Sequence, residues 1–179
     1  MSTPKTIGSE QIQAAIERLA NAITDRHPAG AKLLLLGIAN GGVELARRLA
    51  KRIKAEAGTL DISFHRDDIG RNPIPKEFAR THIPADVNGA TVILVDDVLF
   101  SGRTGKAALD ELFDHGRPAK VELAVLVERG GRLLPLAADY VGLQIEASPI
   151  EKVIVTLDPK DPSLDEIVLE TSAKSQPLA

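Results

Sequence analysis

One segment of the sequence combines two adjacent carboxylates with a short turn of hydroxyl and glycine residues. Asp96 and Asp97 follow a run of aliphatic residues, and Ser101, Gly102 and Thr104 come shortly afterwards. The backbone N–H groups and hydroxyls of such a turn can surround a phosphate where a helix begins. The two carboxylates would repel that phosphate, but they suit neighbouring hydroxyl groups or a magnesium ion. The segment therefore predicts a site for a phosphorylated sugar.

Strands and helices that can position this segment alternate along the chain. Buried or alternating apolar residues predict strands at residues 32–38, 60–64, 91–95, 121–127, 140–145 and 153–157. Helical spacing predicts helices at residues 9–27, with Ser9 as the N-cap, at 43–53 and at 106–115. In the second helix we expect Arg47, Arg48, Lys51, Arg52 and Lys54 to form the solvated side.

This alternation is typical of an α/β fold, a mostly parallel sheet with helices on both faces. Ligands of such sheets bind beyond the carboxyl ends of the strands. The loops to consider are therefore residues 39–42, 66–84, 96–104 and 129–132. The stretch from 67 to 89 lacks periodicity, and a loop of that length is often a functional lid.

Composition limits the classes of protein that the chain can represent. Its 179 residues predict a single domain over residues 1–179, with a disordered tail at residues 170–179. The net charge of −3 gives no global basic excess for nucleic-acid binding. The chain has no cysteine, and neither a membrane span nor a signal peptide is evident, so we expect a cytoplasmic location.

The segment 92–104 resembles the signature that binds phosphoribosyl pyrophosphate (PRPP) in type I phosphoribosyltransferases. That resemblance implies this fold with a small hood region, and magnesium as the cofactor. Asp96 and Asp97 would contact the ribose hydroxyls and, through them or through water, the metal. Residues 101–104 would hold the 5-phosphate. The PRPP-binding residues would be Asp96, Asp97, Val98, Leu99, Phe100, Ser101, Gly102, Arg103 and Thr104.

Four further segments, residues 64–68, 116–118, 123–130 and 138–142, resemble the pyrimidine-operon attenuator and uracil phosphoribosyltransferase (PyrR) family. The resemblance implies that uracil and PRPP give UMP and pyrophosphate, in a homodimer or tetramer. Arg66 would join Asp96 and Asp97 in catalysis, and residues 66–84 would include a lid over PRPP. The pyrophosphate loop would be Ala39, Asn40, Gly41 and Gly42, and the residues near the base Glu128, Arg129, Lys152, Val153 and Ile154.

Other positions depart from the RNA-regulating members of that family. Glu17 and Asn21 replace a threonine and a histidine, Gly131 replaces a histidine, and Ala137 and Leu143 replace basic residues. Because RNA affinity rests largely on basic contacts to phosphate, we expect RNA attenuation to be lost and RNA not to be a partner.

Three alternatives to a uracil enzyme stay open. The acids could be a solvated strand end before an ordinary capped helix. The enzyme could act on another base, although Phe100 stands where purine enzymes carry an acid, which favours a pyrimidine. The chain could instead be a non-catalytic sensor of UMP or PRPP that regulates RNA or a protein partner.

Overall fold

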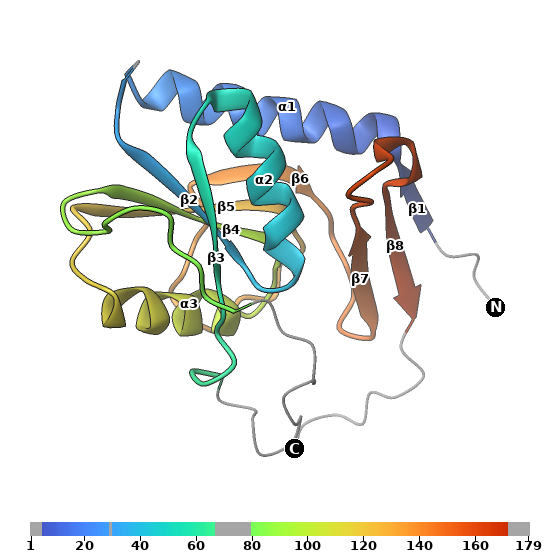
Figure 1. The fold of residues 1–179 in the computed structure, drawn as a ribbon. Helices are drawn as coiled ribbons and strands as arrows, with labels where there is room; N and C mark the ends of the chain where they lie inside the picture. Colours follow the sequence, from blue (N-terminus) through green and yellow to red (C-terminus); the bar gives the residue numbers. More distant parts are fainter. Residues whose placement is uncertain (1–4, 29, 67–79, 172–179) are drawn as a thin grey trace.

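The computed structural model describes residues 5–28, 30–66 and 80–171, and these form a parallel sheet with helices on both faces (Figure 1). The sheet has the strand order β3-β2-β4-β5-β6, and every neighbouring pair in it is parallel. Its strands are β2 (Leu33–Ile38), β3 (Glu56–Leu60), β4 (Thr91–Leu99), β5 (Lys120–Glu128) and β6 (Tyr140–Gln144). The helices are α1 (Ser9–Arg26), α2 (Gly41–Ile53) and α3 (Arg103–Asp114).

The strand order reverses between β2 and β4. From β2 the chain first moves outward to β3 and then crosses back to β4, after which β5 and β6 follow on the other side. Helices α1 and α2 cover one face of the sheet, and α3 covers the other (Figure 1). In open α/β sheets the crevice at such a reversal is where ligands bind.

The core has two layers because successive residues of a strand point to opposite faces. Leu35 and Ile93 pack with the buried side chains of α1 and α2. Their neighbours Leu34 and Leu94 pack with those of α3 on the opposite face. Continuous apolar runs are thus explained by burial on both faces, as parallel strands require.

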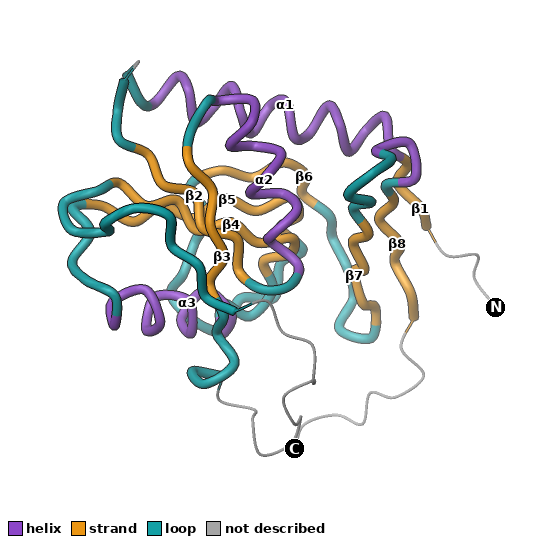
Figure 2. The backbone as a smooth tube through the Cα atoms, viewed as in Figure 1, coloured by secondary structure: helices purple, strands orange, loops and turns teal. Residues whose placement is uncertain are grey.

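A second, antiparallel sheet of order β1-β8-β7 stands beside the main sheet (Figure 2). It consists of β1 (Lys5–Gly8), β8 (Glu166–Thr171) and β7 (Glu151–Thr156), and a 3₁₀ turn, η1 (Pro162–Leu164), precedes β8. The small sheet provides the expected hood region. Neither β1 nor β8 was predicted, since each is short and is stabilised by pairing with a distant segment.

Three local predictions are wrong. Ser9 is the first residue of α1, and the N-cap is Gly8 without a side-chain cap. The strand predicted at residues 60–64 lies earlier in the chain, as β3 (Glu56–Leu60). Phe64 lies on the turn after it and is 80% exposed. Glu170 and Thr171 belong to β8 rather than to a disordered tail, while residues 172–179 lie outside the described residues.

The prediction that Arg48 lies on the solvated side of its helix is wrong, because Arg48 is only 6% exposed. Its guanidinium donates to both carboxylate oxygens of Asp165, at 2.5 and 3.1 Å, and to Glu44 at 2.6 Å. Asp165 also accepts a hydrogen bond from Gln13 of α1 at 2.6 Å. The network joins α1 and α2 to the turn before β8, so helical periodicity alone misassigned this face.

A second buried carboxylate, Glu122, lies near the amino end of β5. Lys120 Nζ, His27 Nε2 and Tyr140 Oη lie 2.6, 2.7 and 2.8 Å from its oxygens. Burial alone would raise the pKa of Glu122, but these partners outweigh it and lower the pKa to about 2. Glu122 is therefore a charged group that stabilises the fold at neutral pH.

Within the described part of the chain, no helix is long and apolar enough to cross a membrane.

Candidate active site

The acid pair lies where β4 runs on beyond its neighbour β2. The last residue of β4 that pairs with β2 is Val95, opposite Gly37. β4 then continues along β5 as far as Leu99. The predicted strand ended at residue 95, so Asp96 and Asp97 lie inside the strand rather than directly after it. From Asp96 onward, the edge of β4 that faced β2 is free for another segment.

The segment that fills this place is the loop of residues 39–42, which leads from β2 into α2. A Cβ atom added to Gly41 would lie 2.5 Å from the carboxylate carbon of Asp97. A Cβ atom on Gly42 would lie 1.9 Å from the carbonyl oxygen of Val95. At residue 42 only glycine permits this approach of backbone to backbone, and a side chain at residue 41 would have to displace the Asp97 carboxylate. The structure thus brings the predicted pyrophosphate loop against the acid pair, at the amino end of a helix.

The two acids differ in environment. Asp96 is buried and accepts a hydrogen bond from the backbone N–H of Asp97 at 2.9 Å, whereas Asp97 is half-buried. Burial raises the pKa of Asp96 well above its usual range, and the adjacent Asp97 carboxylate raises it further. Two adjacent carboxylates, one of them desolvated, are costly to keep ionised together. A cation or hydroxyl donors at this place would relieve that cost.

The turn of residues 100–102 carries the chain from β4 into α3. Gly102 is the N-cap of α3 with φ of 91°, a left-handed conformation that favours glycine. The Ser101 carbonyl accepts hydrogen bonds from the backbone N–H groups of Leu133 and Leu134, both at 3.0 Å, which brace the turn. The first N–H groups of α3 have no partner inside the helix and can bind an anion.

A pocket of about 90 Å³ opens between the acid pair and this helix start. Asp96, Ser101, Gly102 and Thr104 are among the residues that line it. One water needs roughly 10–15 Å³ on the same measure. The pocket therefore has room for a group larger than a single water molecule, beside both a carboxylate and the helix start.

Arg66, the third predicted catalytic residue, lies exposed on the segment after β3. Its neighbour His65 contacts Glu111 and Asp114 in the carboxyl-terminal half of α3, whereas the turn of residues 100–102 precedes the start of that helix. Residues 67–79 of the predicted lid lie outside the described residues. The role of Arg66 stays a prediction.

Arg129, the residue after β5, connects the turn of residues 100–102 to the small sheet. Its guanidinium lies 4.1 Å from the ring centroid of Phe100 and donates to the carbonyl oxygens of Glu151 and Ser148 at 2.9 and 3.1 Å. Its Nε is buried and has no hydrogen-bond partner among the described residues. The sequence did not predict this stack of Arg129 on Phe100, because it joins two loops that are far apart in the chain.

The remaining residues predicted near the base occupy different surroundings. Glu128 ends β5 opposite Leu99 and, with Arg129, lines a hollow of about 420 Å³. Lys152 is exposed and follows the carbonyl that Arg129 binds, so it lies near the end of β5. Val153 is buried in the core opposite Leu169 of β8. Ile154 pairs with Val168 within the small sheet.

Sequence comparisons place this chain among known phosphoribosyltransferases. A family model described as the phosphoribosyl transferase domain matches residues 8–160. The bifunctional protein PyrR of Roseiflexus sp. is 42% identical over 183 residues, which cover 98% of this chain and all of that protein. The bifunctional protein PyrR of Streptomyces coelicolor is 49% identical over 157 residues, 84% of this chain and 81% of that protein.

Solved structures support the same fold. A hypoxanthine-guanine phosphoribosyltransferase from Bacillus anthracis superposes with a TM-score of 0.63 and 26% identity, covering 83% of this chain and 84% of that one. The hypoxanthine phosphoribosyltransferase of Trypanosoma cruzi superposes with a TM-score of 0.62 over 92% of this chain and 95% of that one; at 21% identity, this likeness concerns the fold alone. These matches confirm the predicted fold class and the family resemblance: the chain belongs to the phosphoribosyltransferase family and, within it, to the PyrR family.

Proposed function

We propose that this protein transfers the phosphoribosyl group of PRPP to uracil, which gives UMP and pyrophosphate. The observation that carries the proposal is the acid pair Asp96 and Asp97, held between a glycine loop at one helix start and a hydroxyl turn at another. The two helix starts suit the two phosphate-bearing ends of PRPP, and the acids suit the ribose hydroxyls between them. The PyrR relatives support the same substrate class.

The acid pair fits magnesium as the cofactor. Its carboxylate oxygens are the ligands that magnesium prefers, and a cation would offset the charge of Asp97 beside the desolvated Asp96. Asp96 and Asp97 would hold the ion directly or through the ribose hydroxyls and water. When bound, magnesium supplies positive charge that stabilises the departing pyrophosphate.

In the proposed reaction the bond between the ribose anomeric carbon and the pyrophosphate oxygen breaks, and a bond to N1 of uracil forms. Uracil N1 loses its proton to water, and the pyrophosphate carries away the electron pair of the broken bond. Residues 101–104 would hold the 5-phosphate, and the loop of residues 39–42 the pyrophosphate. Positive charge that develops on the ribose in the transition state would be stabilised by the acid pair beneath it.

The base would lie on the side of Arg129 and Phe100. Two observations support this: the hollow of about 420 Å³ that begins at Glu128, and the ties from Arg129 to the start of the small sheet. Phe100 supplies no acid to a purine ring, which favours a pyrimidine. Val153 and Ile154 contribute through the core and the small sheet rather than through a side chain offered to the base.

A panel of bases tests this function. The purified chain is incubated with magnesium, PRPP and one base at a time, and nucleotide and pyrophosphate are measured together. We expect equal amounts of UMP and pyrophosphate with uracil, and at least tenfold lower kcat/KM with hypoxanthine or guanine. A purine preferred over uracil would refute the base assignment. Binding of UMP without turnover of any base would support the sensor alternative instead.

RNA binding is a second candidate function. The comparisons do not support the expected loss of attenuation, because the curated relatives are named bifunctional. Glu17, one of the departures from the RNA-regulating members, pairs with Arg52 at 3.2 Å, so its negative charge is partly offset. Filter binding with pyrimidine-operon leader RNA, over a range of salt concentrations, decides between retained and lost RNA binding. Tight, salt-sensitive binding would show that the chain binds RNA despite its departures at Glu17, Asn21, Gly131, Ala137 and Leu143.

A further inference from the structure

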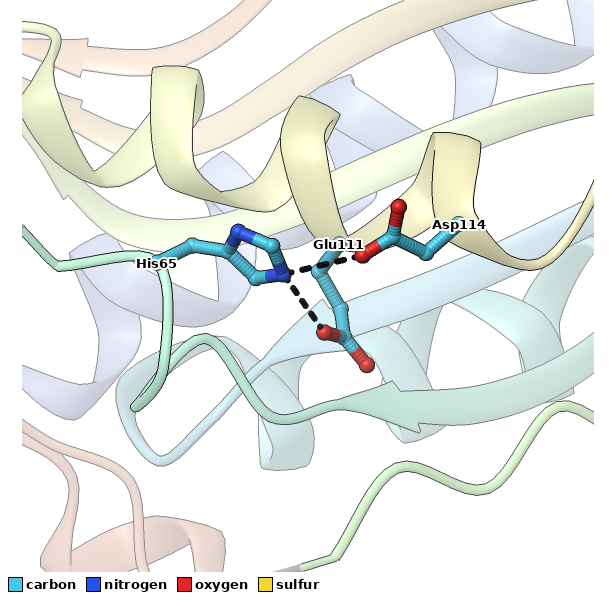
Figure 3. A group of neighbouring side chains, drawn as sticks. All are labelled: His65, Glu111 and Asp114. Carbon is cyan, nitrogen blue, oxygen red and sulfur yellow. Dashed lines mark ion pairs between the residues drawn. The ribbon is translucent and has the colours of Figure 1, made fainter.

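A histidine and two carboxylates converge at the carboxyl-terminal end of α3, opposite the end that follows the turn of residues 100–102. His65 lies on the turn after β3, and Glu111 and Asp114 lie in the last turns of α3 (Figure 3). The Nε2 atom of His65 is 3.2 Å from Glu111 Oε2 and 3.2 Å from Asp114 Oδ2. All three ligand atoms lie within 4.8 Å of one another.

The fold holds these side chains in position. Glu111 and Asp114 are three residues apart on a helix and therefore share a face. The second oxygen of Glu111 accepts a hydrogen bond from Thr81 Oγ1 at 2.8 Å and lies 3.0 Å from His115 Nε2. These contacts fix the carboxylate so that Oε2 faces His65. The His65 backbone N–H, in turn, donates to the Ile62 carbonyl at 3.0 Å, which fixes the turn.

Both distances from the histidine nitrogen to the acids match an edge of a metal coordination shell. Zinc bonds of roughly 2.0–2.2 Å to nitrogen and oxygen place adjacent ligand atoms about 2.8–3.6 Å apart, for angles between octahedral and tetrahedral. Both distances from His65 Nε2 fall in this range. A single ring nitrogen offers at most one proton to two carboxylates. A cation between the three groups would satisfy both acids at once.

The mixture of ligands points to a class of metal. Imidazole nitrogen suits zinc and its neighbours, whereas magnesium prefers oxygen ligands alone and keeps several waters. Asp114 is exposed, so water can complete the coordination. We propose that His65, Glu111 and Asp114 bind a zinc-class divalent cation, which fastens the turn after β3 to the carboxyl-terminal end of α3. This site is separate from the magnesium and PRPP site proposed above.

Calorimetric titration of the full chain with zinc chloride, after treatment with a chelator, tests the site. Excess magnesium is present, so that the acid pair of β4 is saturated. We expect one zinc per chain, and at least tenfold weaker binding in His65→Gln and in Asp114→Asn. Asp110→Asn is the matched control, because Asp110 lies on the same helix and forms its ion pair with Lys106, at 2.5 Å, rather than with the cluster. Melting curves without zinc verify that each variant is folded.

Two outcomes would overturn the proposal. If the wild type binds no zinc, the three side chains form a polar cluster without a metal, and the proposal is wrong. If zinc binds equally to wild type and His65→Gln, the metal lies elsewhere. Crystals soaked in zinc chloride and measured at the zinc absorption edge give an independent answer: we expect an anomalous peak beside His65 Nε2, and a peak only at another place would contradict the assignment.

Discussion

The buried pair of Arg48 and Asp165 gives the sharpest test of how the fold is held together. The Asp165 side chain is fully buried and accepts two of the hydrogen bonds that the Arg48 guanidinium donates, while Glu44 and the Asp158 carbonyl accept others. It also accepts from the Asp158 backbone at 2.8 Å, so one carboxylate organises the turn before β8. Asp165→Asn removes the fully buried counter-charge of Arg48 and leaves Glu44 as its one carboxylate partner among the described residues. Removing one partner of a buried ion pair costs on the order of 3–5 kcal/mol.

This cost is large enough to measure by thermal unfolding. The chain has no tryptophan, so far-UV circular dichroism is the suitable signal. For a chain of this length, each kcal/mol lowers the melting temperature by about 2–4 °C, so we expect a fall of about 6–20 °C. The matched control is Glu17→Gln, which breaks the exposed pair with Arg52 at 3.2 Å and should cost less than about 1 kcal/mol.

Equal effects of Asp165→Asn and Glu17→Gln would refute the reasoning. A loss below about 1 kcal/mol for Asp165→Asn would show that the network adds no net stability. The double variant Arg48→Met with Asp165→Leu should cost less than the sum of its two single changes, because the buried charges are removed together.

Three further predictions concern pH, the loop against the acids and the base side. Stability from Glu122, about 3 kcal/mol, should be complete above pH of about 4.5 and lost as pH falls towards 2, since folding lowers its pKa; Glu122→Gln should flatten this acid limb of the melting-temperature profile. Gly41→Ala should lower kcat/KM for PRPP at least tenfold, because its Cβ would overlap the Asp97 carboxylate, whereas Gly8→Ala, which meets nothing within 4 Å, should not; equal kinetics would contradict the packing. Phe100→Leu should raise KM for uracil more than KM for PRPP, since it removes the stack on Arg129; equal changes in both would refute a role on the base side.

The main sheet was predictable from sequence because its strands are apolar on both faces. The runs 33–36 and 92–95 cannot be solvated on either side, so they define the centre of a parallel sheet. The acid pair and glycine turn that follow one of these runs located the candidate site. Gly41 and Gly42, after the other run, were placed in the predicted pyrophosphate loop, but their close approach to β4 at Val95 and Asp97 becomes evident only with the strand register.

Features that depend on distant partners were beyond the sequence. Arg48 has the spacing of a solvated helix residue, and only Asp165, far along the chain, makes its burial favourable. Strands β1 and β8 pair with each other across nearly the whole chain. The stack of Arg129 on Phe100 likewise joins the ends of two strands. Patterns local in sequence do not record such contacts.

Titration with UMP tests the central claim, that the end of β4 and the start of α3 hold a ribose phosphate. UMP carries the ribose hydroxyls and 5-phosphate but, unlike PRPP, is chemically stable, so calorimetry can compare wild type with Asp97→Asn. A hydrogen bond to a charged group is worth about 1.5–3 kcal/mol, so we expect affinity to fall about 10- to 150-fold. Asp110→Asn, on the exposed side of α3, should bind as the wild type does. Unchanged affinity in Asp97→Asn would contradict the account, because the acid pair would then lie outside the nucleotide site.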